Sequence, residues 1–382
     1  MFKYEKRFLE IICEKSFILF FIGISMIGLL VRICGRQLVS GDAAVFLLPW
    51  FETAKEQGGL SALSGQIGDY NITYQFLICL LSYLPFEPLY LIKGLSIVFD
   101  YALAIVCAGF ARDIAGGNAK KIWALTYGII LMLPTSIINS ALWGQCDSIY
   151  TTFLVMSLWL LWKERYKSSF FILGIAFAFK LQTIFLLPFF VIYYILEKKF
   201  SILNFGLFFA AWYIMCIPGF LYGRTLLEPI KIYMSQTRTY EDMFLGFPSF
   251  WAITGGSYEY LGKLAIFFTI GVLGIGLMYM MSKSIRLKTP GDILLTASWS
   301  VWTCLFFLPC MHERYAYFLD ILLILLTVLK RKYLLFAAIG IFCSIVTCAN
   351  NLFGAGADYR KLAELYFAAY IGFSYLCTRD KQ

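Results

Sequence analysis

Residues 16–42 read SFILFFIGISMIGLLVRICGRQLVSGD, and this stretch decides the fold class. From Ser16 to Ile33 the chain is almost continuously apolar, and a run of this length can cross a bilayer as a helix. A polar stretch follows and carries Gly41-Asp42. The run is continuous rather than alternating, so it predicts a membrane helix and not a strand of a membrane barrel.

Similar apolar runs recur along the whole chain. The 382 residues are 60% hydrophobic and only 14% charged, well below the charge of a soluble domain. No polar stretch is long enough to bury a core of its own, so we expect one all-α, polytopic membrane domain over residues 1–382. We predict twelve crossings, at 16–33, 89–110, 122–139, 148–162, 169–179, 181–196, 203–221, 260–281, 293–308, 315–329, 334–349 and 362–377.

Two apolar segments have lengths that do not fit a single membrane crossing. The run Thr73–Leu84 is too short to span, so we treat it as a re-entrant or interfacial helix within the first loop. The stretch Ser169–Leu196 is either one long tilted helix or two short ones. We divide it at Lys180-Leu181-Gln182, because a Lys and a Gln at mid-bilayer depth would be costly.

The distribution of charge predicts the orientation. With the N-terminus inside, the inner loops and termini hold 20 of the 32 basic residues but only 8 of the 23 acidic ones, as the positive-inside rule requires. Both termini are then cytoplasmic, and the net charge of +9 needs no nucleic-acid partner. Two large segments fall outside, 34–88 and 222–259. The basic start followed by an apolar run resembles a signal peptide, but Arg32–Arg36 is a poor cleavage site, so we expect a retained helix.

The 11 cysteines lie mostly within apolar runs, where they act as small hydrophobic residues. No CxxC pair is present, so neither a zinc site nor a disulfide framework is predicted.

Two polar groups stand out in the first outer loop. Asp42 precedes an apolar stretch with aromatic anchors, Ala43–Phe51, which reads as an interfacial helix. Ser40 or Asp42 would cap that helix; alternatively, the Asp42 carboxylate is a base for an attacking hydroxyl. Gly68-Asp69-Tyr70-Asn71 is a turn by composition, and Asp69 and Tyr70 are also candidates for acceptor contacts.

Two further clusters interrupt the predicted spans on the same side. Trp143-Gly144-Gln145-Cys146-Asp147 combines an aromatic ring, an amide and a carboxylate, as sugar sites do, although any loop needs polar residues. Lys180 either snorkels to the interface or binds a phosphate as a point charge, with Gln182 beside it.

His312-Glu313-Arg314 is the sharpest signal. His312 is the only histidine of the chain and lies in a short turn between two predicted spans. Arginine binds phosphate oxygens bidentately and histidine donates a hydrogen bond or a proton, so the pair suits a phosphate, with Glu313 holding either side chain in place. The segment 222–259 reads as an amphipathic lid in which Arg238 and Tyr240 are weaker candidates. Three charged residues within the bilayer are left outside the site because they can pair within the bundle: Lys93, Asp100 and Asp320.

Four of these motifs, in this order, resemble the GT-C superfamily of integral-membrane glycosyltransferases, including bacterial relatives of the GPI mannosyltransferases and, more distantly, the dolichyl-phosphate-glucose-dependent glucosyltransferases. They are Gly41-Asp42, Trp143–Asp147, Phe179-Lys180-Leu181-Gln182 leading to Leu187-Pro188, and Met311–Tyr315. The resemblance implies a multi-pass enzyme that takes a hexose from a polyprenyl-phosphate carrier and transfers it to a glycan, lipid or protein of the envelope on the non-cytoplasmic face. The transfer would invert the anomeric configuration of the sugar.

The resemblance also implies roles for individual residues. Asp42 would be the general base, and the donor phosphate would be bound by His312, Arg314 and Lys180. The sugar and the acceptor would be contacted by Trp143, Gln145, Asp147, Asp69, Tyr70, Gln182 and Glu313. Some members carry an acidic pair and a metal where this chain has Gln145-Cys146-Asp147, so we expect no metal and no other cofactor. The expected location is a bacterial plasma membrane.

Two other functions fit a polytopic protein. A transporter or flippase of lipid-linked sugars would need charged residues along a path through the bundle, whereas here they gather at one rim. An O-antigen-type polymerase or ligase would depend on arginines in its outer loops, whereas Asp42 and His312-Glu313-Arg314 are the prominent features here.

Overall fold

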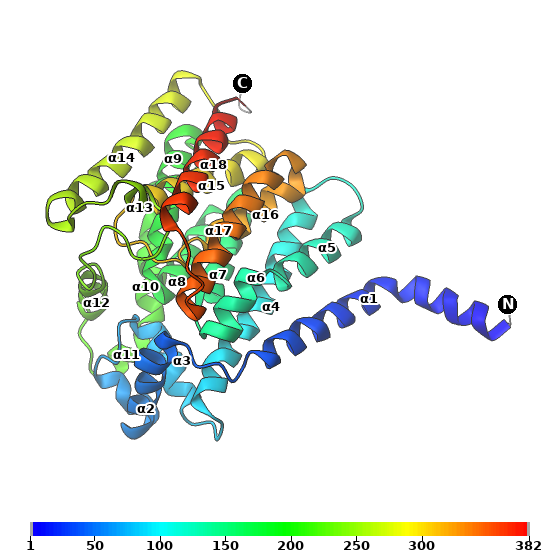
Figure 1. Ribbon diagram of the computed structural model, residues 1–382, viewed down its shortest axis with the longest axis horizontal. Coiled ribbons are helices and arrows are strands. Elements are labelled where there is room, and N and C mark those ends of the chain that lie inside the picture. The colour runs from blue at the N-terminus through cyan, green and yellow to red at the C-terminus, as the bar shows by residue number, and fades with distance from the viewer. Residues whose placement is uncertain (1–2, 380–382) are drawn as a thin grey trace.

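The computed structural model describes residues 3–379, and this part of the chain is helical throughout, with 77% of residues in helices and no strand (Figure 1). The helices are α1 (Lys3–Cys34), η1 (Ala43–Leu47), α2 (Leu48–Glu56), η2 (Gly59–Ser64), α3 (Ile72–Leu81), α4 (Pro88–Ile114), α5 (Ala119–Leu131), α6 (Pro134–Ile137), η3 (Ile138–Trp143), α7 (Asp147–Trp162), α8 (Tyr166–Phe179), η4 (Leu181–Leu186), α9 (Leu187–Glu197), α10 (Asn204–Met215), α11 (Ile217–Leu221), α12 (Glu228–Gln236), α13 (Phe250–Thr254), α14 (Tyr258–Ser282), α15 (Pro290–Phe307), α16 (Tyr317–Leu329), η5 (Arg331–Tyr333), α17 (Leu334–Phe353) and α18 (Tyr359–Arg379).

The expectation of an all-α protein with membrane-type helices is confirmed, but twelve crossings are not supported. Among the described residues, four segments are long and apolar enough to cross a bilayer: Glu14–Cys34, Pro88–Ile114, Tyr258–Ser282 and Arg331–Phe353. The bent pair formed by α5 with α6 and η3 is a fifth if it counts as one span. Most other predicted crossings are helices too short for a bilayer, such as α7, whose 16 residues extend only about 24 Å. Helices α15 and α18 are longer, with 18 and 21 residues, but they are not among the segments that are apolar enough.

Prolines and polar residues account for the short helices. Pro134 starts a new helix after α5, with a bend of 47° between the two pieces. Lys180 has an extended backbone, with φ −151° and ψ 132°, and separates α8 from η4 and α9. The predicted division of Ser169–Leu196 at Lys180 therefore agrees with the structure, as does a short helix, α3, in the place of Thr73–Leu84.

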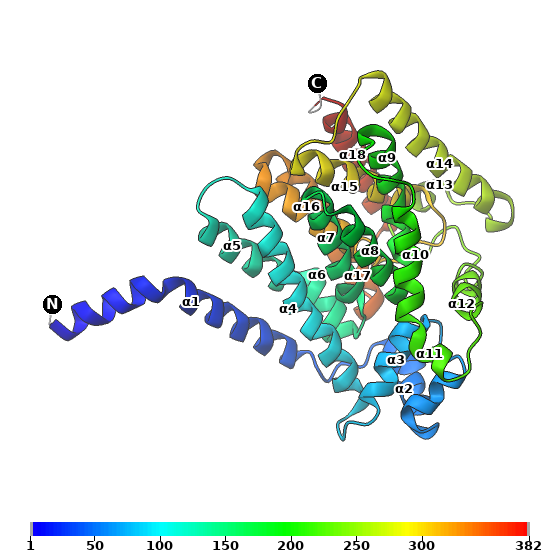
Figure 2. The same ribbon diagram turned by 180° about the vertical axis from the view of Figure 1, so that it is seen from behind.

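The core is one large hydrophobic cluster that includes α15 and α16, beside a small second cluster of Met243, Trp251 and Ala265. Every residue of α15 from Ile293 to Phe307 is buried, and so are the first ten residues of α16. Helices α1 and α14 lie at opposite flanks of the bundle in both ribbon views (Figures 1 and 2). Both expose long apolar faces, as helices in contact with lipid do. The cysteines Cys79, Cys107, Cys216, Cys304 and Cys343 are buried, as expected of small hydrophobic residues.

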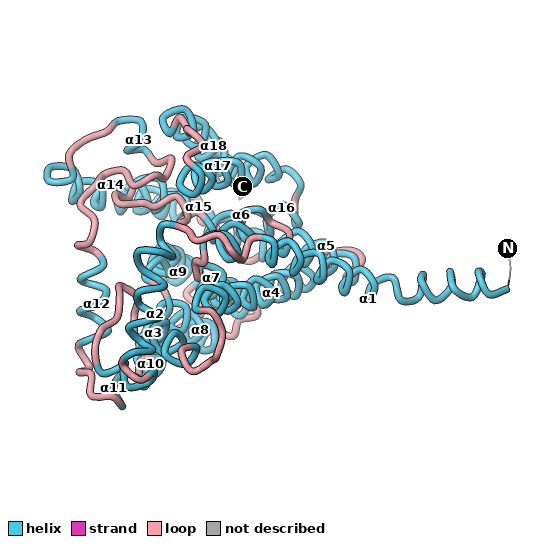
Figure 3. Tube along the Cα trace, turned by 60° about the horizontal axis from the view of Figure 1, so that its bottom comes forward, coloured by secondary structure: helices cyan, strands magenta, loops and turns pink. Residues whose placement is uncertain are grey.

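The first loop is a folded unit. Residues 34–88 form η1, α2, η2 and α3, which gather with α11 at the end of the bundle remote from the C-terminus (Figures 1 and 3). Arg224, from the second large loop, is buried against this unit. Its Nε donates to the carbonyl of Leu63 at 2.6 Å, and its Nη1 and Nη2 donate to Gln66 and Gln75 at 2.7 Å each. The two segments predicted to lie outside are thus joined to each other.

The charges predicted within the bilayer have structural partners in two of three cases. Asp100 forms a buried ion pair with Arg32 of α1 at 2.8 Å. Lys93 donates to three carbonyls at the end of α1, including that of Leu38 at 2.6 Å. Asp320 is fully buried and has no cationic partner among the described residues.

The loops predicted to lie inside also contact one another. Lys163 pairs with Asp113 at 2.6 Å and Lys199 with Glu164 at 2.6 Å. The backbone N–H of Leu287 donates to Glu197 at 2.6 Å. Several loops of the set predicted to lie inside therefore contact one another, as the two large segments of the other set do.

Candidate functional site

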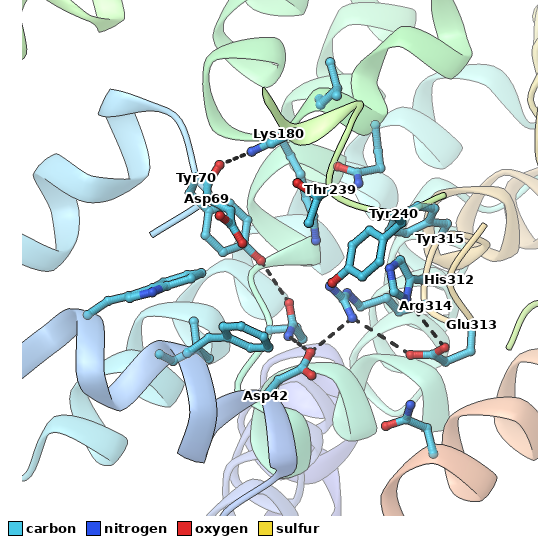
Figure 4. Close-up of a pocket in the computed structure, with 18 residues that line it drawn as sticks. Asp42, Asp69, Tyr70, Lys180, Thr239, Tyr240, His312, Glu313, Arg314 and Tyr315 are labelled. Atoms are coloured by element: carbon cyan, nitrogen blue, oxygen red, sulfur yellow. Dashed lines mark hydrogen bonds and ion pairs between the residues drawn. The ribbon is translucent and has the colours of Figure 1, made fainter. Parts of the chain in front are cut away.

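One pocket brings together residues from all four sequence motifs. Its volume is about 200 Å³, and it opens beside the folded first loop. Figure 4 shows side chains from η1, from the turn before α3, from the break after α8 and from the α15–α16 loop pointing toward a common space. The lining residues are Asp42, Phe46, Leu47, Trp50, Asp69, Tyr70, Gln145, Lys180, Leu181, Gln182, Gln236, Thr239, Tyr240, His312, Glu313, Arg314, Tyr315 and Asn351.

The Asp42 carboxylate faces the pocket and does not cap its helix. The cap is Ser40, whose hydroxyl accepts from the N–H of Ala43 at 3.1 Å, and Asp42 makes no capping bond. Its Oδ2 instead accepts from Gln145 Nε2 at 2.7 Å and from Arg314 Nη1 at 3.1 Å (Figure 4). Of the two candidates for the cap, Ser40 fills that role and Asp42 faces the pocket.

Gln145 connects Asp42 to the turn before α3. Its Oε1 accepts from the hydroxyl of Tyr70 at 3.1 Å while its amide N–H₂ serves Asp42. Burial is the main cause that raises the pKa of Tyr70 well above its usual value, so this hydroxyl remains a donor. Gly144 has φ +79°, which turns the chain sharply between η3 and α7 and aims Gln145 at the pocket. The turn at Gly68 and the pocket role of Asp69 and Tyr70 are thus compatible.

Lys180 and Asp147 form a buried ion pair at the floor of the site. The ammonium of Lys180 bonds Asp147 Oδ1, and Asn139 Nδ2 donates to the other carboxylate oxygen at 2.6 Å. Lys180 lines the pocket but is only 4% exposed, and Asp147 is fully buried and does not line it. Lys180 does not snorkel to the interface, and Asp147 reaches the ligand space only through Lys180.

Trp143 also lies behind the pocket wall. Its ring is 1% exposed, and the guanidinium of Arg314 lies 5.6 Å from the ring centre. This is the geometry of a cation–π contact. Trp143 is therefore not among the residues that line the pocket, and its ring supports Arg314.

The turn at His312 is covered by the second large loop. Tyr240 packs edge-on against the imidazole at 4.8 Å, and the backbone of Leu245 and Gly246 pairs with that of His312. Burial, helped by Arg314 and Lys180, lowers the pKa of His312 to about 3, so the imidazole is neutral at neutral pH. Its Nε2 is buried and makes no hydrogen bond to any described residue.

Glu313 lies between the histidine and the arginine. Its two carboxylate oxygens are each 3.9 Å away, one from His312 Nδ1 and the other from Arg314 Nη1. Burial raises the pKa of Glu313, and the Arg314 charge opposes that shift. Because Glu313 is only 3% exposed, it is better placed to orient its neighbours than to contact a large ligand.

Some pocket residues carried no clear signal in the sequence. Gln236, Thr239 and Asn351 stand near the ends of α12 and α17 and reach the pocket only through the tertiary fold. The sequence predicts Phe46 and Trp50 only as membrane anchors, yet both residues form part of the pocket wall. The sequence predicts a helix at Ala43–Phe51, where η1 and α2 lie, but it does not predict which residues the aromatic side chains of that helix contact. Of the two weaker candidates, Tyr240 lines the pocket and Arg238 is exposed outside it.

Among residues 3–379, no group of three or more His, Cys, Asp and Glu side chains lies close enough to hold a metal ion. The site's charged groups are instead cross-paired, with Arg314 and Lys180 opposite Asp42, Asp147 and Glu313.

No protein-family model matches this chain, and no curated protein matches it.

Proposed function

We propose that this protein is an inverting, GT-C-like membrane glycosyltransferase that takes a sugar from a polyprenyl-phosphate carrier and transfers it to an envelope glycan, lipid or protein. The observation that carries the proposal is that Asp42, Gln145, Arg314 and His312 line one pocket, although they lie far apart in the sequence. Such a transfer needs one base for the acceptor and a positive or hydrogen-bonding group for the leaving phosphate.

Asp42 is the proposed base. In the reaction the acceptor oxygen forms a bond to the anomeric carbon, the bond from that carbon to the phosphate oxygen breaks, and the acceptor proton passes to Asp42. The polyprenyl phosphate leaves as an anion. Gln145 keeps one carboxylate oxygen oriented, and the other oxygen is free to meet the acceptor hydroxyl.

Arg314 and His312 are the proposed phosphate ligands. In the ligand-free pocket Arg314 is paired with Asp42, so an incoming phosphate competes with that carboxylate for the guanidinium. Donor binding then releases Asp42 for the acceptor. His312 enters as a neutral donor of a hydrogen bond. Lys180 lines the pocket but is paired with Asp147 behind it, and this pairing suits long-range attraction better than direct contact.

The carrier accounts for the surroundings of the pocket. Phe46, Leu47 and Trp50 give one wall an apolar character. They lie close to the long apolar helices that a polyprenyl tail would follow in a bacterial plasma membrane, with the pocket on the outer face. The pocket is lined in part by the folded first loop, whose helices lie at one end of the bundle (Figure 1), and this favours transfer over transport.

The test is a transfer assay on purified protein with polyprenyl-phosphate-linked glucose or mannose and acceptors extracted from membranes. Asp42→Asn should abolish transfer while donor binding persists. Glu52→Gln, an exposed carboxylate on α2 outside the pocket, is the matched control and should keep full activity. Full activity of Asp42→Asn would remove the proposed base, and movement of lipid-linked sugar in liposomes without transfer would favour a flippase.

A further inference from the structure

A second, smaller cavity lies beneath the pocket, among α6, η3, α16 and α17. Its volume is about 10 Å³, which is the space that one water-sized particle needs for its centre. Glu313 and Arg314 line both this cavity and the pocket above it. The remaining lining residues are Thr135, Asn139, Tyr317, Asp320, Ser344 and Cys348.

Asp320 is the unusual member of this group. Four carboxylates are buried within residues 3–379, and three of them have a cationic side chain within 4.0 Å: Asp100 with Arg32, Asp147 with Lys180, and Glu313 with Arg314. Asp320 is fully buried and forms no ion pair in the described chain. A buried carboxylate without a counter-charge is strongly unfavourable, so Asp320 must hold either a proton or a cation.

Oxygen atoms without partners surround Asp320. Asn139 uses its amide N–H₂ on Asp147, so its Oδ1 remains an acceptor and makes no hydrogen bond to a described residue. The hydroxyls of Thr135 and Ser344 lie beside the Asp320 carboxylate but make no hydrogen bond of good geometry with it. All four side chains are more than nine-tenths buried.

The close packing of α17 on α16 brings these atoms together. A Cβ on Gly340 would lie 3.3 Å from Leu323 Cδ1, a tight contact, and 3.6 Å from Asp320 Oδ1, so Gly340 faces α16 beside the carboxylate. Ser344 follows one turn later on the same face of α17.

We propose that this cavity is a binding site for a monovalent cation of the size of Na⁺, held by Asp320, Asn139, Thr135 and Ser344. A carboxylate, an amide oxygen and hydroxyl oxygens are hard ligands that suit a hard cation. The single unpaired carboxylate balances one positive charge, and a divalent ion would leave an excess. With Asp320, Glu313 and Arg314 ionised, the lining carries one net negative charge, which one such ion neutralises.

A proton on Asp320 or a bound water is the competing occupant. A protonated carboxyl would donate its one proton to a single neighbouring oxygen, Asn139 Oδ1 or one of the hydroxyls, and would leave the others to find partners elsewhere. A water would satisfy those atoms but would leave the negative charge uncompensated. The cation meets both requirements, and the proposal holds whether or not the protein transfers sugar.

The test is thermal unfolding of the purified full-length protein in NaCl, KCl and choline chloride at equal ionic strength and at two pH values. Na⁺ should raise the Tm, and at about 100 times its Kd the rise should be on the order of 3 °C. Asp320→Asn should unfold in choline chloride at the wild-type Tm or above it, and Na⁺ should no longer shift it. Ser344→Ala should need a several-fold higher Na⁺ concentration for the same shift.

The control is Thr347→Val on α17. The Thr347 hydroxyl donates to the carbonyl of Cys343 at 2.9 Å and does not line the cavity, so this variant should keep the Na⁺ shift. Equal Tm values in the three salts would overturn the proposal. If the Tm changes with pH identically in the three salts, a proton and not a cation neutralises Asp320. A Na⁺-dependent rise in Tm that persists in Asp320→Asn would also exclude this site. If Asp320→Asn does not fold, an unchanged Na⁺ dependence in Ser344→Ala would exclude it.

Discussion

At the scale of single residues, the charges of the pocket depend on Arg314. Its guanidinium contacts Asp42 at 3.1 Å, lies 3.9 Å from Glu313 and stands 5.6 Å from the ring centre of Trp143. A lysine is a point charge on a flexible stem and would reproduce neither the fork geometry nor the contact with the ring.

We therefore expect Arg314→Lys to lower the rate of sugar transfer by about 10²-fold, because a preorganised donor to the leaving phosphate is lost. Steady-state kinetics with varied donor concentration would measure this. Arg360→Lys, an exposed arginine on α18, is the control and should behave as wild type. Unchanged kinetics in Arg314→Lys would show that the fork of donors is not needed.

His312 gives a prediction for pH. Its pKa falls to about 3 in the folded protein, below the 6.5 of a free histidine, so between these values the unfolded chain binds more protons. Stability from this residue is therefore fully present above about pH 6.5 and is lost as the pH falls toward 3. His312→Gln should make the Tm less sensitive to acid between about pH 7.5 and pH 5, as thermal unfolding would measure. An equally acid-sensitive Tm in His312→Gln would assign the effect to other groups.

At the scale of elements, the break between α8 and η4 is fixed by the buried pair of Lys180 with Asp147 of α7. Removing one partner leaves an uncompensated buried charge. Asp147→Asn should therefore lower the free energy of unfolding by about 3–5 kcal/mol, whereas the double variant Lys180→Met with Asp147→Asn should recover much of it. Chemical unfolding in detergent would measure both. Recovery of stability without recovery of transfer would show that the Lys180 charge also serves the reaction.

The contact between the second large loop and the His312 turn gives another prediction. Gly246 has φ +81°, and a Cβ there would lie 2.8 Å from Glu313 Oε2. Gly246→Ala should weaken this contact and lower transfer. Gly255→Ala is a matched control, since Gly255 has φ +66° in the same loop with nothing within 4 Å of a Cβ. Activity assays on both variants separate backbone strain, which they share, from the clash with Glu313, which only Gly246→Ala has; equal losses would exclude a role for the clash.

At the scale of the whole molecule, the two groups of loops should lie on opposite sides of the membrane. With Cys34 and Cys310 replaced by serine, Ser61→Cys in the first loop should react with an impermeant maleimide in intact cells. Lys288→Cys in the α14–α15 loop should react only after permeabilisation. Both positions are exposed. The reverse pattern would invert the orientation and place the pocket in the cytoplasm.

The sequence by itself determined the helical membrane class, the break at Lys180, the short helix near Thr73 and the four polar motifs, because hydropathy, proline and charge act locally along the chain. It overestimated the crossings, since an apolar helix buried in a protein core and one in lipid have the same composition. Only the tertiary structure decided that Ser40 caps the helix while Asp42 faces Arg314, and that Trp143 and Asp147 lie behind the pocket. These outcomes depend on which side chains meet across more than a hundred residues, as with Asp42 and Gln145, and no local pattern contains that information.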